Sequence, residues 1–243
     1  IIDFKKFIKY DVDMSDYLSF PREVENATNT VGDGKANAWG FGMMADLSQA
    51  IAQGQSEAKT IVLRGRPNMT CAGFDLKVMK NEPERVVALV DTGARLLCQM
   101  LSCPKPIIIA STGHAMAAGA LMMLAGDMRI GLAGDYKYGL NETAIGMTMP
   151  DFGLDLAVHR LGMHNMSMAV LSAQLYEPMT AAQIGYLDRV VEPNDFETSL
   201  AEAIDYYQSL DARAYAGTKR KIHQSLVDKI LAGLNPEDLN ISA

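Results

Sequence analysis

Apolar residues recur along this chain with two different periods, and together they predict an α/β protein. Short uninterrupted apolar runs bounded by turn residues, at residues 60–65 and 107–109, are typical of buried strands. Helical patterns cover residues 39–53, 85–100 and 212–231. Strands that alternate with helices, followed by a helical tail, favour an α/β core with a C-terminal helical subdomain.

The same pattern sets the expected boundaries. Short strands are expected near residues 129–132 and 137–139, and Pro67 and Asn68 indicate a loop. An extended segment at residues 188–193 interrupts the helical pattern toward the C-terminus. We therefore expect three parts, with residues 1–29 as an irregular lead and first strands, 30–190 as the α/β core, and 191–243 as the C-terminal helical subdomain.

Residues 106–126 contain no acidic or basic side chain, and this segment is the most informative part of the sequence. It is long enough to span a bilayer, but Gly113, His114 and Gly119 interrupt it, so a buried strand, a turn and a buried helix fit it better. The helix is expected to begin near Ala117, where the first amide N–H groups of a helix have no partner. Such a terminus can stabilise negative charge that develops on a ligand oxygen.

Composition and charge exclude several functional classes. The chain has 243 residues, with 29 acidic and 22 basic side chains, and its net charge of −7 disfavours binding to nucleic acid or to an anionic membrane. The three cysteines form no CxxC motif and no Cys/His metal spacing, and their odd number argues against a disulfide framework. We expect a cytoplasmic protein in a reducing compartment, with no metal and no membrane or nucleic-acid partner.

Common catalytic motifs are missing, so a few single residues carry the candidate chemistry. The sequence has no phosphate-binding loop, dinucleotide fingerprint, nucleophile elbow or HExxH zinc motif. Glu142, in YGLNETAIG, is expected to act as acid or base beside the helix terminus, with a capping or surface role as the alternative. Asp151 and Asp155 follow it and could reach the same pocket. His159 and His164 are five residues apart, do not share a helix face and form a poor metal site.

Several motifs occur together in an order that points to a family. They are RGRPNMTCAGFDLKVM (64–79), KPIIIASTGHAMAAGALMMLAGDMRI (105–130) and YGLNETAIGM (138–147), with DGKANAW upstream and MTAAQIGYLDRVVEP downstream. In this order and spacing the chain resembles, over residues 19–231, the enoyl-CoA hydratase and isomerase family, the crotonases. The resemblance implies a spiral of repeated ββα units with outer helices, and assembly into homotrimers or dimers of trimers.

The resemblance also implies a chemistry and the residues that perform it. Crotonases act on acyl-coenzyme A thioesters, whose carbonyl oxygen becomes an enolate held by two backbone N–H groups. The matching motifs put these donors at Phe74, in CAGFDLK, and at Ala118, in MAAGAL, where the family usually has glycine at the second position. No cofactor is expected beyond coenzyme A as part of the substrate. Asp127, which closes the buried helix, is expected to be structural.

The first of these loops is similar to the loop that binds the coenzyme's nucleotide in the family. The resemblance therefore implies that the backbone of Ala72 and the side chain of Lys77 contact the coenzyme. It implies the same role for Lys219, from the last predicted helix. The alternative for both lysines is an ordinary exposed position, and TKRK, residues 218–221, is also typical of a solvated helix face.

One departure from the family pattern favours one reaction over another. Hydratases of the family carry a glutamate two residues after the last glycine of the turn and a second glutamate in the later loop. Here the first position is Leu121 and only Glu142 remains. One glutamate beside an oxyanion hole suits a proton shift from C2 to C4 of a 3-enoyl-CoA, as in the family's 3,2-enoyl-CoA isomerases. Hydration, thioester hydrolysis, C–C cleavage and a catalytically idle binding protein remain alternatives.

Overall fold

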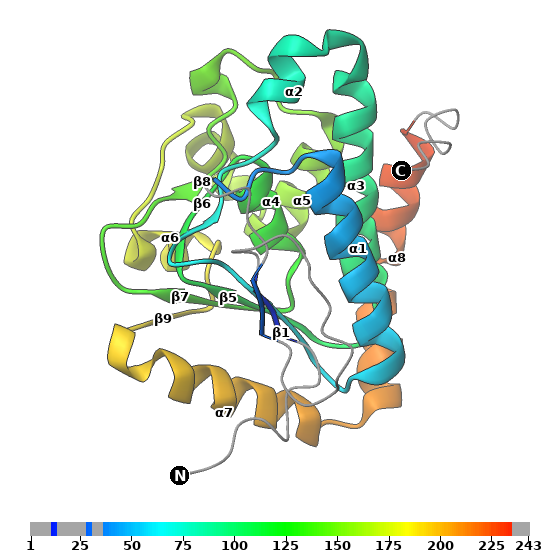
Figure 1. The fold of residues 1–243 in the computed structure, drawn as a ribbon, viewed down its shortest axis with the longest axis vertical. Helices are drawn as coiled ribbons and strands as arrows, with labels where there is room; N and C mark the ends of the chain where they lie inside the picture. Colours follow the sequence, from blue (N-terminus) through cyan, green and yellow to red (C-terminus); the bar gives the residue numbers. More distant parts are fainter. Residues whose placement is uncertain (1–10, 14–27, 31–35, 235–243) are drawn as a thin grey trace.

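The computed structural model describes residues 11–13, 28–30 and 36–234, which form an α/β fold with two parallel sheets (Figure 1). Much of the expected irregular lead, residues 1–29, lies outside this described part. The larger sheet has the strand order β2-β1-β3-β5-β7-β9, and the smaller has the order β4-β6-β8. The larger contains β1 (Asp11–Asp13), β2 (Thr28–Thr30), β3 (Ile61–Arg64), β5 (Ile107–Ser111), β7 (Met128–Leu132) and β9 (Arg189–Val191). The smaller contains β4 (Asn68–Cys71), β6 (Gly113–Met116) and β8 (Tyr138–Gly139).

Successive ββα units make up the centre of the chain, and they form the crotonase-like spiral that the sequence predicts. In each unit the first strand joins the larger sheet and the second joins the smaller one, as in β3 and β4, β5 and β6, and β7 and β8. The helices that follow these pairs are α2 (Leu76–Asn81) and α3 (Val86–Ser102), then α4 (Ala118–Ala125), then α5 (Asp151–Leu161). The repeat therefore brings the carboxyl end of each small-sheet strand to the chain segment that leads into a helix.

The larger sheet is buried on both faces, and its central strands β3 and β5 are apolar except for their last residues, Arg64 and Ser111. Every residue of β5 is 0% exposed, as expected for a continuous β-branched run. Alternate side chains point to opposite faces. Ile107 and Ile109 join the main core, which includes residues of α1 (Phe41–Glu57), α3 and α4, whereas Ile108 packs with α7 (Phe196–Ser209).

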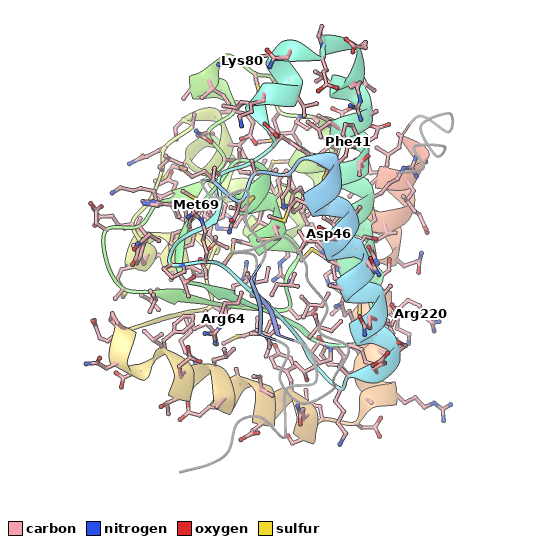
Figure 2. All side chains as sticks on the ribbon, in the orientation of Figure 1. Phe41, Asp46, Arg64, Met69, Lys80 and Arg220 are labelled. Carbon is pink, nitrogen blue, oxygen red and sulfur yellow. The ribbon has the colours of Figure 1, made fainter. Side chains whose placement is uncertain are left out.

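α7 is held against the larger sheet by an ion pair as well as by apolar packing. Arg64, at the end of β3, donates from both Nη atoms to the carboxylate of Glu197 in α7, at 2.7 Å each. Figure 2 shows Arg64 between the sheet and this helix. Because the Glu197 side chain is 64% exposed, the pair contributes at most about 1 kcal/mol. Buried Phe196 and Leu200 therefore supply most of the stabilisation.

The helices predicted at residues 39–53, 85–100 and 212–231 are confirmed as α1, α3 and α8 (Ala212–Ala232), with ends that differ by a few residues. α8 begins after Asp211, whose carboxylate caps the helix by accepting from the Ala214 amide at 2.7 Å. It packs against α3 and α5, and α6 (Pro178–Ile184) lies near β9. None of the described helices has the length and apolarity to cross a membrane. The division into a core and a C-terminal helical subdomain stays a prediction.

Two expectations about loops are wrong. The expected loop at Asn68 is the start of β4, and the expected turn that contains Gly113 and His114 is the start of β6. Both strands are four residues long and include Gly, Asn or Ala, which are depleted in strands, so local propensity does not reveal them. Parallel pairing of β4 and β6 forms these strands instead.

The smaller sheet depends on a close backbone approach at Gly113. This residue pairs with Asn68 across β4 and β6, and a Cβ atom at Gly113 would overlap the backbone of Asn68 and Met69. A glycine here lets the two strands pair at this separation without displacing either of them.

Replacing Gly113 with alanine should lower the free energy of unfolding by about 3 kcal/mol or more, because one of the two strands must shift. Gly217→Ala is the matched control, since Gly217 lies within α8 and no atom is found within 4 Å of its Cβ position. This control should raise the free energy of unfolding by about 0.5–1 kcal/mol. Urea titration measures both effects, and equal stabilities for the two variants would contradict the packing argument.

Candidate active site

The three strands of the smaller sheet end side by side, and each leads into one of the predicted site residues. One register row crosses β4, β6 and β8 at Cys71, Ala115 and Tyr138. Phe74 and Ala118 each lie three residues after this row, and Glu142 lies four residues after it. Because the strands are parallel, the chain leaves the sheet at the same end three times. The topology thus brings the predicted oxyanion donors and the predicted base to one end of the sheet.

Two backbone amides at this end have the placement of an oxyanion hole. Ala118 is the first residue of α4, so its N–H has no acceptor inside the helix. Among the residues that the structure describes, the Ala118 and Phe74 amides donate to no backbone or side-chain acceptor. The two peptides are neighbours, since a Cβ on Gly73 would lie 3.6 Å from the Ala118 nitrogen and 2.9 Å from the Ala117 Cβ. The oxyanion roles of Phe74 and Ala118 stay predictions, and this geometry supports them.

The start of α4 is held in a strained backbone conformation. Ala117, the residue before the helix, has φ 50° and ψ −123°, a region that residues with a Cβ rarely adopt. Its amide donates to the Gly139 carbonyl at 3.0 Å, and the Leu121 amide donates to its carbonyl at 3.0 Å. At Gly119, a Cβ would overlap the Cys71 carbonyl. These contacts fix the direction of the first helical amide, and burial of all of α4 offsets a strain of about 1–3 kcal/mol.

The Phe74 peptide lies between two anchored neighbours. The Trp39 amide donates to the Gly73 carbonyl at 2.8 Å, and the Asp75 amide donates to the Trp39 carbonyl at 3.1 Å. The Phe74 ring meets the Trp39 ring edge to face, with 6.0 Å between the ring centroids. Gly93 of α3 leaves room for the ring, because a Cβ there would lie 2.6 Å from it. Contacts on both sides therefore hold this peptide in place.

Glu142 lies in the loop after β8, and it is buried although residues 143–146, which follow it, are exposed. Its carboxyl group is buried, with the residue 6% exposed, and its Oε2 has no hydrogen-bond partner within the described part of the chain. Amides of Ile145 and Met147 donate to its carbonyl at 3.1 and 2.9 Å, which fixes the turn. Burial raises the pKa of Glu142 from an ordinary 4.5 to about 7. A carboxyl group with this pKa can both take and return a proton near neutral pH.

The position where the family's hydratases carry a second glutamate is apolar. Leu121 lies in the first turn of α4 and is 0% exposed. A Cβ atom added to Gly153 of α5 would lie 3.5 Å from the Leu121 Cδ1 and 2.7 Å from the Met149 sulfur, so both side chains occupy the space beside this glycine. An apolar contact between α4 and α5 thus occupies this position.

The predicted coenzyme contacts on the first loop lie near the same end of the sheet. The Ala72 amide donates to the Ala36 carbonyl at 3.1 Å, and no described residue donates to the Ala72 carbonyl. Lys77 is the second residue of α2 and its side chain is exposed, and its amide donates to the capping carboxylate of Asp75 at 2.8 Å. The coenzyme roles of Ala72 and Lys77 stay predictions.

Lys219 lies in a different setting from the exposed phosphate contact that the sequence predicts. It is 4% exposed, and its ammonium donates to Asp127 Oδ2 at 2.5 Å and to the Lys105 carbonyl at 3.2 Å. Asp127 also accepts from the Ile107 amide at 2.8 Å, so its structural role is confirmed. A coenzyme role for Lys219 stays a prediction that would require this buried ion pair to open.

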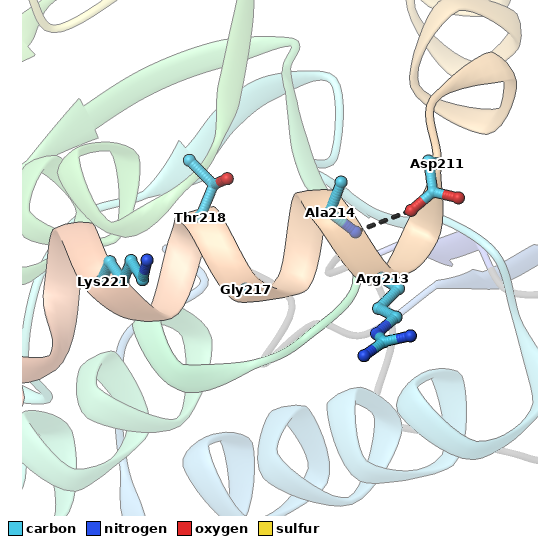
Figure 3. A pocket seen from close by; sticks show the side chains of 6 residues that line it. All are labelled: Asp211, Arg213, Ala214, Gly217, Thr218 and Lys221. Carbon is cyan, nitrogen blue, oxygen red and sulfur yellow. Dashed lines mark hydrogen bonds between the residues drawn. The ribbon is translucent and has the colours of Figure 1, made fainter.

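A surface depression of about 380 Å³ lies along the first turns of α8 (Figure 3). Its lining includes Asp211, Arg213, Thr218 and Lys221. Positions 218 and 221 share a helix face, whereas Lys219 is turned about 100° away from position 218 and points into the core. Within TKRK, positions 218 and 221 are therefore exposed to solvent, whereas Lys219 is buried. The sequence analysis considered the whole TKRK segment and chose Lys219 within it, which is the inward lysine, because polar side chains alone do not reveal which face of a helix packs.

Other candidate side chains make contacts away from the smaller sheet. His159 Nε2 lies 3.0 Å from His223 Nδ1, between α5 and α8, so it does not form the metal pair considered from the sequence. Asp155 pairs with Lys229 of α8 at 2.7 Å, and Asp151 is exposed at the start of α5. The two aspartates that follow Glu142 in the sequence therefore interact with α8 or solvent.

Comparison with known proteins identifies the family. The model of the enoyl-CoA hydratase/isomerase family matches residues 30–238. The chain belongs to this family. It is therefore an enzyme of the enoyl-CoA hydratase/isomerase type, with the crotonase fold.

Relatives within the family have different activities in their names. A probable enoyl-CoA hydratase of Rhodobacter capsulatus is 30% identical over 200 residues, 82% of this chain and 77% of that protein. A family member of known structure from Pseudomonas syringae is 34% identical, with a TM-score of 0.85 over 94% of this chain and 100% of that one. A Mycobacterium tuberculosis protein, named an enoyl-CoA isomerase in one solved structure and a probable enoyl-CoA hydratase in another, is 32% identical; the first of these structures has a TM-score of 0.77 over 84% of this chain and 89% of that one. Family membership alone does not select hydration or isomerisation.

The buried carboxyl group of this enoyl-CoA hydratase/isomerase should make its stability depend on pH. Burial raises the folded-state pKa of Glu142 from 4.5 to about 7, so ionisation is harder in the folded protein and stability falls as the pH rises through this interval. Glu142→Gln removes this loss. The free energy of unfolding of Glu142→Gln should therefore exceed that of the parent by an amount that grows between about pH 4.5 and pH 7. The difference should reach at most about 3 kcal/mol and then stay constant.

Urea titrations of the parent and Glu142→Gln, at several pH values from about 5 to 8, measure this difference. Glu177→Gln is a suitable control, because Glu177 is exposed. A gain for Glu142→Gln that does not change with pH would show that the carboxyl group titrates with its ordinary pKa.

Proposed function

We propose that this enzyme is a 3,2-enoyl-CoA isomerase, which moves the double bond of a 3-enoyl-CoA to the 2-position. The observation that carries the proposal is the combination, at one end of the smaller sheet, of two unpaired amides and one buried carboxyl group. Leu121 strengthens it, because an apolar side chain stands where a second acid would be needed to orient water.

In the proposed reaction, the thioester carbonyl oxygen accepts hydrogen bonds from the Phe74 and Ala118 amides. Glu142, as the carboxylate, removes a proton from C2 of the 3-enoyl-CoA. The electron pair of the broken C–H bond moves into the thioester to form a dienolate, whose negative charge the two amides stabilise. Glu142 then returns the proton to C4, and the double bond forms between C2 and C3. No atom is gained or lost, so one acid–base group is sufficient.

The environment of Glu142 supports both halves of this cycle. A pKa of about 7 leaves a useful fraction of carboxylate near neutral pH, and it makes the protonated form a weaker acid than an exposed glutamic acid. The conjugate base is correspondingly stronger, which favours removal of the weakly acidic C2 proton. Burial also limits access of water to the enolate.

Coenzyme A would enter as part of the substrate, with no further cofactor. We propose that the Ala72 backbone and Lys77 contact its nucleotide part, and that Lys219 takes part only if its ion pair with Asp127 opens. Assembly into homotrimers or dimers of trimers is also part of the proposal. Large apolar side chains that a single chain exposes, Met163, Met168 and Leu171, are where a partner copy would be sought first.

Hydration of a 2-enoyl-CoA is the second candidate, and the name of the Rhodobacter capsulatus relative favours it. The two reactions have distinguishable products. With 3-hexenoyl-CoA an isomerase yields a product of unchanged mass, whereas hydration of 2-hexenoyl-CoA adds one water. Mass spectrometry detects the added water, and chromatographic separation of 2-hexenoyl-CoA from 3-hexenoyl-CoA detects isomerisation, so the two measurements together test the proposal.

The parent protein should isomerise 3-hexenoyl-CoA and leave 2-hexenoyl-CoA unhydrated. Glu142→Gln should lower isomerisation by about 10² to 10⁴-fold, because the amide keeps the size of the side chain and cannot accept the proton. Leu121→Glu should introduce slow hydration by adding a second acid. Brisk hydration by the parent, with Leu121 in place, would overturn the isomerase proposal and favour the hydratase.

Ala118→Pro should remove one oxyanion donor with little effect on the fold. Ala118 is the first residue of α4, a position where proline is tolerated because the missing N–H has no helical acceptor. Loss of one donor should lower kcat by about 10² to 10³-fold. Steady-state kinetics, with circular dichroism as the folding control, measures this effect. A folded Ala118→Pro variant with normal turnover would refute the assignment of this amide.

A further inference from the structure

Three buried hydroxyl groups form a chain between the two sheets, close to the site. Thr70 Oγ1 lies 2.7 Å from Ser111 Oγ, and Ser111 Oγ lies 2.9 Å from the Tyr138 hydroxyl. All three side chains are 0% exposed. Ser111 belongs to β5 of the larger sheet, whereas Thr70 and Tyr138 belong to β4 and β8 of the smaller one. The chain of hydroxyls therefore crosses the core between the sheets.

The three hydroxyl groups can donate hydrogen bonds in one continuous series. Burial raises the pKa of Tyr138 to about 12, so the phenol stays protonated near neutral pH and can donate to Ser111 or accept from it. Ser111 and Thr70 can donate to each other or to the Gly113 carbonyl, at 3.0 and 3.2 Å. The order Tyr138, Ser111, Thr70, Gly113 carbonyl uses all three hydroxyl hydrogens. Successive bonds of this kind polarise one another, so losing one hydroxyl weakens the others.

Two glycines leave space for these hydroxyls. A Cβ on Gly131 of β7 would lie 3.0 Å from the Tyr138 hydroxyl, and a Cβ on Gly65 would lie 2.7 Å from Thr70 Oγ1. Larger side chains at these positions would push the hydroxyls apart. The backbone of the larger sheet and its connection to β4 are thus shaped around the chain.

Each strand linked by the hydroxyls leads to a different part of the candidate site. β4 leads to Phe74, β5 leads through β6 to Ala118, and β8 leads to Glu142. We infer that Thr70, Ser111 and Tyr138 are positioning residues, whose hydroxyl chain fixes how these strands lie relative to one another and hence where the amides stand relative to Glu142. This inference rests on the proposed function.

Hydrogen bonds suit this role because they depend on direction as well as distance. Apolar contacts between strands tolerate small sliding movements, whereas a hydrogen bond weakens steeply when its angle or length changes. A displacement of about 1 Å at reacting groups can lower a rate by about 10²-fold. Loss of the chain should therefore affect turnover more strongly than it affects substrate binding.

Paired substitutions at Thr70 separate the hydroxyl group from the shape of the side chain. Thr70→Val keeps the shape and removes the hydroxyl, whereas Thr70→Ser keeps the hydroxyl and removes a methyl group. With 3-hexenoyl-CoA, Thr70→Val should lower kcat by about 10-fold and change KM by less than about twofold. Thr70→Ser should restore most of the parent's kcat. An equal loss in both variants would assign the effect to packing and overturn the inference.

Tyr138→Phe tests the other end of the chain, with Tyr176→Phe as the matched control. Tyr176 is also buried, 3% exposed, but its hydroxyl is not part of the Thr70–Ser111–Tyr138 series. It donates instead to the Met168 carbonyl at 2.7 Å. Both variants lose one buried phenol hydrogen bond. Only Tyr138→Phe should lower kcat by about 5 to 10-fold, and a similar loss in Tyr176→Phe would contradict a specific role for the chain.

The pKa of Glu142 gives a readout that needs no catalysis. Two pairs of proteins are compared: the parent with Glu142→Gln, and Thr70→Val with the double variant Thr70→Val/Glu142→Gln. In each pair, the pH dependence of the difference in free energy of unfolding gives the pKa of Glu142. A displaced Glu142 loop admits water, so its pKa should fall toward 4.5 in Thr70→Val. If kcat and this pKa both match the parent, the inference is wrong while the isomerase proposal stands. If the parent does not isomerise its substrate, the proposed function is wrong, and the pKa comparison still decides whether the chain positions Glu142.

Discussion

Direct contact between backbone segments, with no side chain between them, sets the geometry at the end of the smaller sheet. At the carboxyl end Gly119 lets the first turn of α4 approach the Cys71 carbonyl and Gly73 lies beside Ala117, while at the amino end Gly113 lets β6 approach β4. A methyl group at any of these glycines would separate the two segments. Because they touch, the peptides of Phe74 and Ala118, more than forty residues apart in the sequence, lie close together. The candidate oxyanion hole is thus a consequence of backbone packing.

The same packing lowers stability in two places that the proposed chemistry uses. Ala117 is held at a positive φ without the freedom of glycine, and Glu142 is buried with a raised pKa. Each feature destabilises the fold by about 1–3 kcal/mol, and the buried apolar residues of α4 and the larger sheet offset both. Local conflicts of this kind are expected where a site requires them, because a relaxed helix start and an exposed carboxylate would neither aim an amide nor raise a pKa.

Elements whose pattern is local could be predicted from the sequence, and elements created by pairing could not. Burial of a strand or of one helix face produces a recognisable pattern of apolar residues. This pattern predicts the strand at residues 107–109 and the helices α1, α3 and α8. β4 and β6 have no such pattern, because each exists only beside the other. Phe74, Ala118 and Glu142 were accessible through motif order. The buried position of Lys219 was not, since it depends on which face of α8 meets α3 and α5.

The physical argument for the proposed isomerisation concerns the position at which the family's hydratases carry a further glutamate. Hydration needs a water molecule held by two or more polar partners beside the substrate double bond. Leu121 presents methyl groups at the first turn of α4, and it is packed with Gly153 and Met149 of the segment that leads into α5. An apolar side chain at this position offers no hydrogen-bond partner to a water molecule. A proton shift requires no such water, because the carboxyl group itself carries the proton from C2 to C4 while the amides hold the charge.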